Sequence, residues 1–212
     1  MTLPLLFAYS FVVGFGAVVT PGPVTTAIVS ESARRGFIVG PLVSTGHALL
    51  EFIMVALIAL GLSAGLNTPA LTTVIALIGG ALLLWMGFGM ARGALKGKLT
   101  LPEPGADVNL LSNRRLIGLG IGATMINPFW YVWWVTVAAT YILTAQVLGW
   151  AGVIAFYLGH ISADFLWNSV LSGIVGSGRK WITGGVYKSI ILACSVYLIY
   201  LGIAFVTLPL TR

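Results

Sequence analysis

Two apolar stretches of the chain carry the same polar pattern, which is glycine, histidine, three residues, an acid and then phenylalanine. The pattern occupies residues 46–52 and again residues 159–165. Residues four apart lie on one face of a helix, so each histidine and the acid that follows it would form a two-pronged polar site. The four ionisable side chains are His47, Glu51, His160 and Asp164.

Such groups are expensive inside a membrane, where one ionisable side chain at mid-span costs about 2.5 to 3.5 kcal/mol. Four of them at matched positions therefore favour a function, either a binding site or an ion pathway near the middle of the membrane. The simpler alternative is that the two pairs hydrogen-bond to each other and hold helices together.

The composition assigns the chain to the integral membrane proteins. Hydrophobic residues make up 58% of the sequence and charged residues 8%, and the mean hydropathy is +1.03, far outside the range of soluble domains. The net charge of +6 comes from short basic clusters between apolar runs, a pattern typical of membrane topology rather than of nucleic-acid binding. No His-Glu-x-x-His signature or phosphate-binding glycine loop occurs, so we expect neither an enzyme nor a resident cofactor.

Apolar runs long enough to cross a bilayer, about 18 residues or more, occur six times. They lie near residues 3–29, 37–62, 70–91, 116–143, 147–176 and 186–208. Ten of the eleven Lys and Arg residues fall in the first, third and fifth connections between the runs. Basic residues favour the cytoplasmic side, so both termini are predicted to lie outside the cell in a multi-pass protein.

Prolines interrupt the first and fourth runs in their interiors. Pro21, Gly22 and Pro23 stand in the first run, and Asn127 and Pro128 stand in the fourth. Proline lacks a backbone donor and clashes with the preceding turn, so both helices are predicted to break there. Broken helices at membrane depth are tolerated where the freed backbone faces protein or a watered cavity, and their amino ends suit a substrate carboxylate.

An aromatic cluster follows the second break directly and begins with Trp130. Because it starts at mid-depth, it could line a substrate cavity or pack over a cation. Packing against lipid or core is the alternative for this cluster.

Landmarks of the first half recur in the second half in the same order. Gly46 matches Gly159 (159 − 46 = 113), Gly87 matches Gly202 (202 − 87 = 115) and Pro21 matches Pro128 (128 − 21 = 107). Three spans in each half would make the second half inverted relative to the first, as in many secondary transporters. We therefore predict an all-α membrane protein with six transmembrane helices in a 3+3 inverted repeat. Residues 1–95 form the first repeat, residues 96–115 a cytoplasmic linker containing the Pro/Gly-rich segment 102–107, and residues 116–212 the second repeat.

These residues together resemble the LysE/RhtB-type amino-acid exporters over essentially the whole chain. The matching features are Pro21-Gly22-Pro23 in the first run, the basic turn ending Arg34-Arg35-Gly36, Gly40 and Gly46 in the second run, and Asn127-Pro128 in the fourth. Phe129 departs from the basic residue found there in many members, and the doubled Gly-His-acid pattern is not a general feature of the family. The resemblance implies an inner-membrane exporter of amino acids or similar small metabolites, driven by the proton gradient or the membrane potential.

The leading hypothesis is a proton-coupled exporter. Glu51 and Asp164 would hold the substrate ammonium, and the broken-helix ends near Gly22 and Asn127 would hold its carboxylate. Proton coupling would fall to the His-acid pairs, because imidazole titrates near neutral pH.

A divalent-metal exporter is the alternative. Two histidines and two carboxylates could bind zinc, manganese or a similar cation as the transported substrate. Its ligands would be His47, Glu51, His160 and Asp164. In either case the expected partners are a small substrate and the lipid bilayer, with no nucleic acid, and a homo-oligomer is left open.

Overall fold

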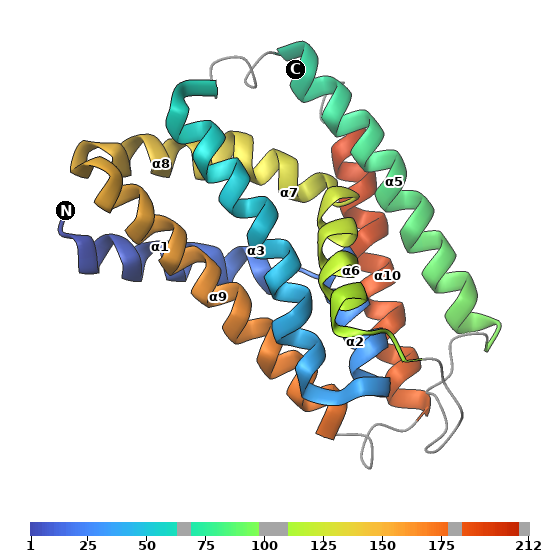
Figure 1. Ribbon diagram of the computed structural model, residues 1–212. Helices are drawn as coiled ribbons and strands as arrows, with labels where there is room; N and C mark the ends of the chain where they lie inside the picture. The colour runs from blue at the N-terminus through green and yellow to red at the C-terminus, as the bar shows by residue number, and fades with distance from the viewer. Residues whose placement is uncertain (63–68, 98–109, 178–183, 208–212) are drawn as a thin grey trace.

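The computed structural model of the chain describes residues 1–62, 69–97, 110–177 and 184–207, and all regular structure within them is helical (Figure 1). The α-helices are α1 Leu3–Val18, α2 Pro23–Arg35, α3 Val39–Leu57, α5 Pro69–Leu95, α6 Asn113–Met125, α7 Pro128–Trp133, α8 Ala139–Ala145, α9 Gly149–Ser177 and α10 Gly184–Thr207. Short 3₁₀ or π turns extend several of them, namely η1 Gly36–Ile38, η2 Ile58–Leu62, η3 Trp134–Ala138 and η4 Gln146–Leu148. The Pro/Gly-rich segment 102–107 of the expected linker lies outside the described residues.

The helices break where the prolines predicted. α1 ends at Val18, and α2 begins at Pro23 with Gly22 as its N-cap. α6 ends at Met125, and α7 begins at Pro128. Proline is tolerated in the first turn of a helix, where its missing N–H would have no partner. Each proline therefore begins a new helix instead of bending an old one.

One boundary differs from the prediction. The sequence suggested a connection from Ser30 onward, yet α2 continues through its basic residues to Arg35. Positive charges in the last turn interact favourably with the carboxyl end of a helix, and the helix stops at Gly36, where φ is +73°. The Arg35 guanidinium then donates to the carbonyl of Leu111 and to Oδ1 of Asn113, so it ties the end of α2 to the start of α6.

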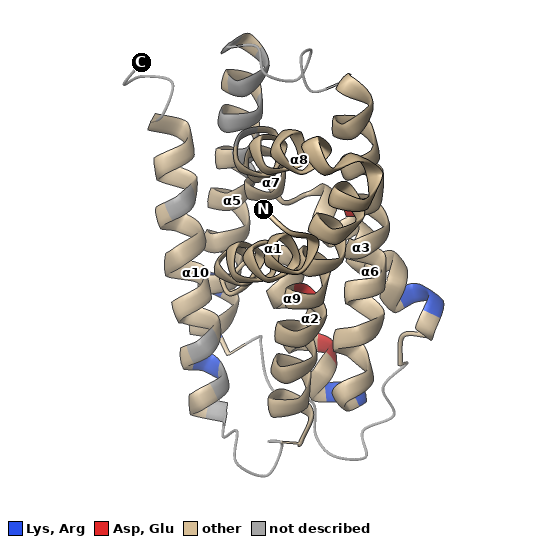
Figure 2. Cartoon of the chain, turned by 90° about the vertical axis from the view of Figure 1, so that its left-hand side faces the viewer, with Lys and Arg blue, Asp and Glu red and all other residues tan. Residues whose placement is uncertain are grey.

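Three helix pairs organise the packing. α5 packs along α10, α1 along α9 and α6 along α3, and α3 and α9 also contact each other. In Figure 1, α5 and α10 form one flank, while α1 and the α7–α8 segment run across the other helices. Figure 2, turned by 90°, shows α1, α7 and α8 nearly end-on, which agrees with that crosswise course.

Glycines allow two of these pairs to approach closely. A Cβ at Gly46 of α3 would collide with the backbone carbonyl of Ile117 on α6, and a Cβ at Gly159 of α9 would collide with that of Phe7 on α1. Small residues at helix crossings permit such backbone contact in membranes. Each glycine directly precedes one of the two histidines, so the close contacts determine where the histidines lie.

The main core fills the space between α1, α3, α7–α8 and α9. Its largest fully buried side chains include Leu6, Ile58, Trp134, Ile142 and Phe156. This core packs directly against the face of α9 that carries His160.

Two helical stretches of 39 residues, Pro23–Gly61 and Ala139–Ser177, are long and apolar enough to cross a membrane by length and composition. Leu3–Val18 and Ile191–Thr207 are shorter apolar helices. The described Lys and Arg residues gather in the lower half of Figure 2. The number of spans and their orientation remain predictions.

Candidate functional site

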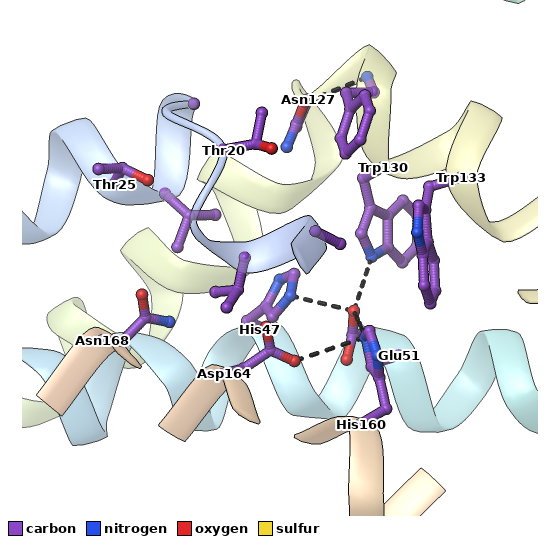
Figure 3. Close-up of a pocket in the computed structure, with 15 residues that line it drawn as sticks. Thr20, Thr25, His47, Glu51, Asn127, Trp130, Trp133, His160, Asp164 and Asn168 are labelled. Atoms are coloured by element: carbon purple, nitrogen blue, oxygen red, sulfur yellow. Dashed lines mark hydrogen bonds and ion pairs between the residues drawn. The ribbon is translucent and has the colours of Figure 1, made fainter. Parts of the chain in front are cut away.

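The two His-acid pairs meet where α3 and α9 pack together (Figure 3). Nε2 of His47 lies 3.0 Å from Oε1 of Glu51, and Nε2 of His160 lies 3.2 Å from the same oxygen. Nε2 of His160 also lies 3.5 Å from Oδ2 of Asp164. The helical spacing predicted each pair separately, and the structure joins them through one carboxylate oxygen of Glu51.

Two tryptophans complete the surroundings of that oxygen. The indole N–H groups of Trp130 and Trp134 each donate to Oε1 of Glu51 at 3.3 Å. The second oxygen of Glu51 and Oδ2 of Asp164 are buried and accept no hydrogen bond from the described residues. Only 1% of Glu51 and 2% of Asp164 is exposed. Because a buried acceptor without a donor is unfavourable, both oxygens can gain a partner when a cationic ligand enters.

Thr124 is a functional candidate that the sequence reasoning missed. It lies on α6, and its Oγ1 is 2.7 Å from Nδ1 of His47. The same hydroxyl donates to the carbonyl of Gly120 at 2.7 Å. A polar residue in the apolar stretch just before Asn127 was the available signal, but only the packing of α6 on α3 brings it to the histidine.

The aromatic cluster after Asn127 lines the site as well as packing in the core. The Trp133 ring stacks on the His160 imidazole with a centroid separation of 4.6 Å and an interplanar angle of 23°. Trp130 and Trp133 both line the pocket described next, whereas Trp134 is fully buried. Of the two interpretations of this cluster, cavity lining therefore applies to Trp130 and Trp133.

A single pocket unites these residues with both helix breaks. Its empty space is about 530 Å³, which includes the open solvent at its mouth. The lining residues are Ala17, Val18, Thr20, Gly22, Val24, Thr25, His47, Glu51, Asn127, Phe129, Trp130, Trp133, His160, Asp164 and Asn168. Figure 3 shows the acidic side chains on one side of the pocket and Thr20 and Asn127 across from them.

The two breaks differ in what they offer a ligand. No side chain caps α2 at Gly22, and the first N–H groups of a helix have no intrahelical acceptor. Asn127 caps α7 itself, because its Oδ1 accepts from the N–H of Phe129 at 3.1 Å. Its Nδ2 points toward Gly22, where a Cβ would lie 3.6 Å away. The groups that can donate to a ligand here are therefore the first N–H groups of α2 and Nδ2 of Asn127.

The structure assigns the predicted site residues to two groups. The lining residues are Gly22, His47, Glu51, Asn127, Trp130, His160 and Asp164. Pro21 and Pro23 are not among them; they form the break between α1 and α2, as Pro128 forms the start of α7. Asn168, one helical turn beyond Asp164, also lines the pocket and was missed. Its Nδ2 donates to Oγ of Ser44 at 2.9 Å.

A ligand set for a cation is present in the same cluster. One oxygen or nitrogen atom from each of His47, Glu51 and Asp164 lies within 4.8 Å of the others. Glu51 is already engaged by His160 and two indoles.

Comparison with known proteins determines the class of protein. The family model described as LysE type translocator matches residues 15–208. The chain belongs to the LysE family. It is therefore a membrane transporter and not an enzyme, and the resemblance seen in the sequence is confirmed.

Relatives of this LysE-family chain include two arginine exporter proteins named ArgO. The protein from Salmonella paratyphi A is 27% identical over 161 residues, which cover 74% of this chain and 72% of the relative. The protein from Escherichia coli K12 is 26% identical over 169 residues, which cover 76% and 75%. No solved structure matches the chain. These findings give no support to the divalent-metal alternative.

Proposed function

We propose that this LysE-family protein exports amino acids across the inner membrane, with the zwitterionic part of the substrate bound in the pocket between α2, α3, α7 and α9. The observation that carries the proposal is the distribution of unused groups around one pocket. Among the described residues, two buried carboxylate oxygens accept no hydrogen bond, although Nε2 of His160 lies 3.5 Å from the one on Asp164. Across the pocket, no side chain caps the start of α2 and the Asn127 side chain lines the wall.

The acidic wall suits the substrate ammonium. The unpartnered oxygens of Glu51 and Asp164 are buried, and charge-assisted hydrogen bonds to an ammonium are about twice as strong as neutral ones. The lining residues that the structure describes include no Lys or Arg, so the local charge favours a cation. Trp130 and Trp133 add aromatic faces beside it.

The opposite wall suits the substrate carboxylate. Pro23 has no N–H, so the free backbone donors of the first turn of α2 are those of Val24 and Thr25, and both residues line the pocket. The positive end of a helix dipole attracts an anion. Oδ1 of Asn127 caps α7, so Nδ2 is the atom of this amide that would donate to the substrate.

The 3+3 inverted repeat belongs to this proposal, with residues 1–95 and 116–212 as its halves. Its support is a set of matched backbone features. Gly36 and Gly149 have nearly the same backbone angles, with φ of +73° and +65°, at an offset of 113 residues. The crossing of Gly46 over Ile117 matches that of Gly159 over Phe7. The symmetric partners α5 and α10 pack on each other.

The remaining features of the proposal come from the sequence. Six spans with basic first, third and fifth connections give two outward termini. Proton coupling through the His-acid cluster would drive export against a gradient. The relatives named as arginine exporters make arginine the first substrate to test.

Transport by inside-out vesicles tests the proposal. Vesicles carrying the protein and a matched set without it receive an imposed proton gradient and a panel of labelled amino acids, with divalent cations offered in parallel. We expect gradient-dependent uptake of at least one amino acid and no uptake of a metal ion. Uptake of a metal ion alone, lost in His47 or His160 variants, would overturn the amino-acid assignment.

A further inference from the structure

The His47 ring is held at both of its nitrogens. The Thr124 hydroxyl lies 2.7 Å from the carbonyl of Gly120 and 2.7 Å from Nδ1 of His47. We assign its one hydrogen to the Gly120 carbonyl, which can only accept, and Nδ1–H of His47 then donates to the hydroxyl oxygen. Nε2 of His47 lies 3.0 Å from Oε1 of Glu51. That oxygen already accepts two indole N–H groups, which favours an ionised carboxylate. Nε2 therefore donates to it, and both ring nitrogens carry hydrogen.

The His160 ring is held at one nitrogen only. Nε2 lies 3.2 Å from Oε1 of Glu51, whereas Nδ1 is buried and has no partner among the described residues. Nδ1 faces Gly14 of α1, where a Cβ would lie 2.5 Å away. A second hydrogen on this ring would leave a buried N–H without an acceptor among the described residues, which favours the neutral ring in this conformation.

Gly14 and Thr124 occupy corresponding positions in the two halves. The close crossings pair Phe7 with Gly159 and Ile117 with Gly46, which gives an offset of 117 − 7 = 110 residues between α1 and α6. The same offset leads from Gly14 to Thr124, since 124 − 14 = 110. The residue that anchors one histidine is thus replaced by glycine beside the other.

We infer that His160 is the ring that takes up and releases the transported proton, whereas His47 is a fixed positive charge positioned by Thr124. The inference rests on the proposed function, because it assigns the proton coupling of that same site. The second hydrogen at His160 requires an acceptor at Nδ1. Such an acceptor becomes available when α1 moves away from α9 and admits water, so proton uptake is linked to a displacement of α1.

Few titratable groups among the described residues face His160. Among the described residues, the titratable groups that face it are Glu51 and His47 from α3 and Asp164 from its own helix. α1 contributes Gly14, and the α7–η3 segment contributes the indoles of Trp133 and Trp134. The two histidines share the same acids, so their difference lies in the contacts of Nδ1.

Nitrogen-15 NMR of labelled histidine reads this difference directly, because the chain contains only two histidines. The full-length protein in lipid nanodiscs is titrated from alkaline to acidic pH, and His47→Gln and His160→Gln assign the two rings. We expect both nitrogens of His47 to remain protonated, while Nδ1 of His160 moves from the unprotonated to the protonated region. A titrating His47 ring, or a His160 ring that does not change, would overturn the inference.

Thr124 has its own matched pair of variants. Thr124→Val removes the hydroxyl at nearly constant volume and should release His47 to titrate, whereas Thr124→Ser keeps the hydroxyl and should preserve the fixed ring. Unchanged His47 signals in the valine variant would contradict the positioning role of Thr124.

Transport separates the two roles further. Substrate counterflow exchanges substrate across the membrane without net proton movement. Gradient-driven accumulation, by contrast, requires net proton movement. We expect His160→Gln to lose gradient-driven accumulation and retain counterflow, and His47→Gln to lose both activities. If His47→Gln lost accumulation alone, the assignment would be overturned. If the wild-type protein moves no amino acid, the proposed function fails, while the NMR titration still decides which ring exchanges its proton.

Discussion

Glu51→Gln removes the charge from the oxygen on which the whole cluster converges while keeping the shape of the side chain. Oε1 receives Nε2 of His47 at 3.0 Å and Nε2 of His160 at 3.2 Å. The indoles of Trp130 and Trp134 also donate to it. In the glutamine variant each of these bonds loses its ionised acceptor, and the bonds from the neutral indoles become neutral.

The size of the effect follows from those contacts. A hydrogen bond to a charged group contributes about 1.5 to 3 kcal/mol and a neutral one about 0.5 to 1.5 kcal/mol, so each loses about 1 kcal/mol. The two indole contacts, whose donors are neutral, then lose about 2 kcal/mol together, which is about 30-fold in an equilibrium constant. The substrate ammonium loses a charged partner in addition. We therefore expect transport to fall at least about 30-fold.

The assay compares Glu51→Gln with Glu31→Gln, the same substitution on α2 at a residue outside the pocket lining. Initial uptake rates in inside-out vesicles are measured at matched protein amounts, with size-exclusion profiles as the test of folding. Asp164→Asn is measured alongside, and we expect it too to abolish transport in a folded protein. Full activity in both Glu51→Gln and Asp164→Asn would remove the His-acid pairs from the mechanism.

Three further predictions follow from the packing and the site. Gly46→Ala should destabilise the protein by about 1 to 3 kcal/mol through overpacking, because the added Cβ would meet the backbone of α6. Gly118→Ala is the control and should be neutral or stabilising, because open space surrounds its Cβ. Equal melting temperatures of the two variants would contradict this prediction. Asn127→Ala should lose the cap of α7, which lowers stability by about 0.5 to 2 kcal/mol, and should raise the KM of uptake. Asn127→Asp should keep the cap but lose uptake, because its carboxylate repels that of the substrate. A fully active aspartate variant would rule out the carboxylate-binding role of Asn127. Trp134→Phe removes one hydrogen-bond donor to Glu51. It should lower uptake about tenfold, corresponding to about 1.4 kcal/mol, while the size-exclusion profile stays normal. Uptake at the wild-type rate would show that this bond is dispensable.

Local rules predicted much of the chain correctly. The apolar runs and their prolines indicated where helices lie and where the first and fourth break, because proline affects the backbone at its own position. The spacing of His47 and Glu51 indicated one polar face for the same reason. The end of α2 was predicted several residues too early, because basic residues were interpreted as a connection although they are compatible with the last turn of a helix.

Contacts between distant segments were beyond such rules. Thr124 looked like one hydroxyl residue among apolar neighbours, and it becomes a partner of His47 only because Gly46 and Gly120 let α3 and α6 approach closely. The Trp134 indole was equally ambiguous, since a tryptophan after a break can face lipid, core or cavity. Its bond to Glu51 depends on the course of the chain from α7 into η3.

The sequence by itself determined the membrane class, the family and the residues able to do chemistry, because hydropathy, motifs and helical periodicity are local properties of the chain. Only the tertiary structure decided that both histidines contact one oxygen of Glu51 while His160 also contacts Asp164. It also decided which carboxylate oxygens among the described residues accept no hydrogen bond, and that Thr124 and Gly14 make the two histidines unequal. These properties depend on the crossing of α3 with α9 and on their packing against α6 and α1. That geometry is set by close contact between backbones that lie far apart in the sequence.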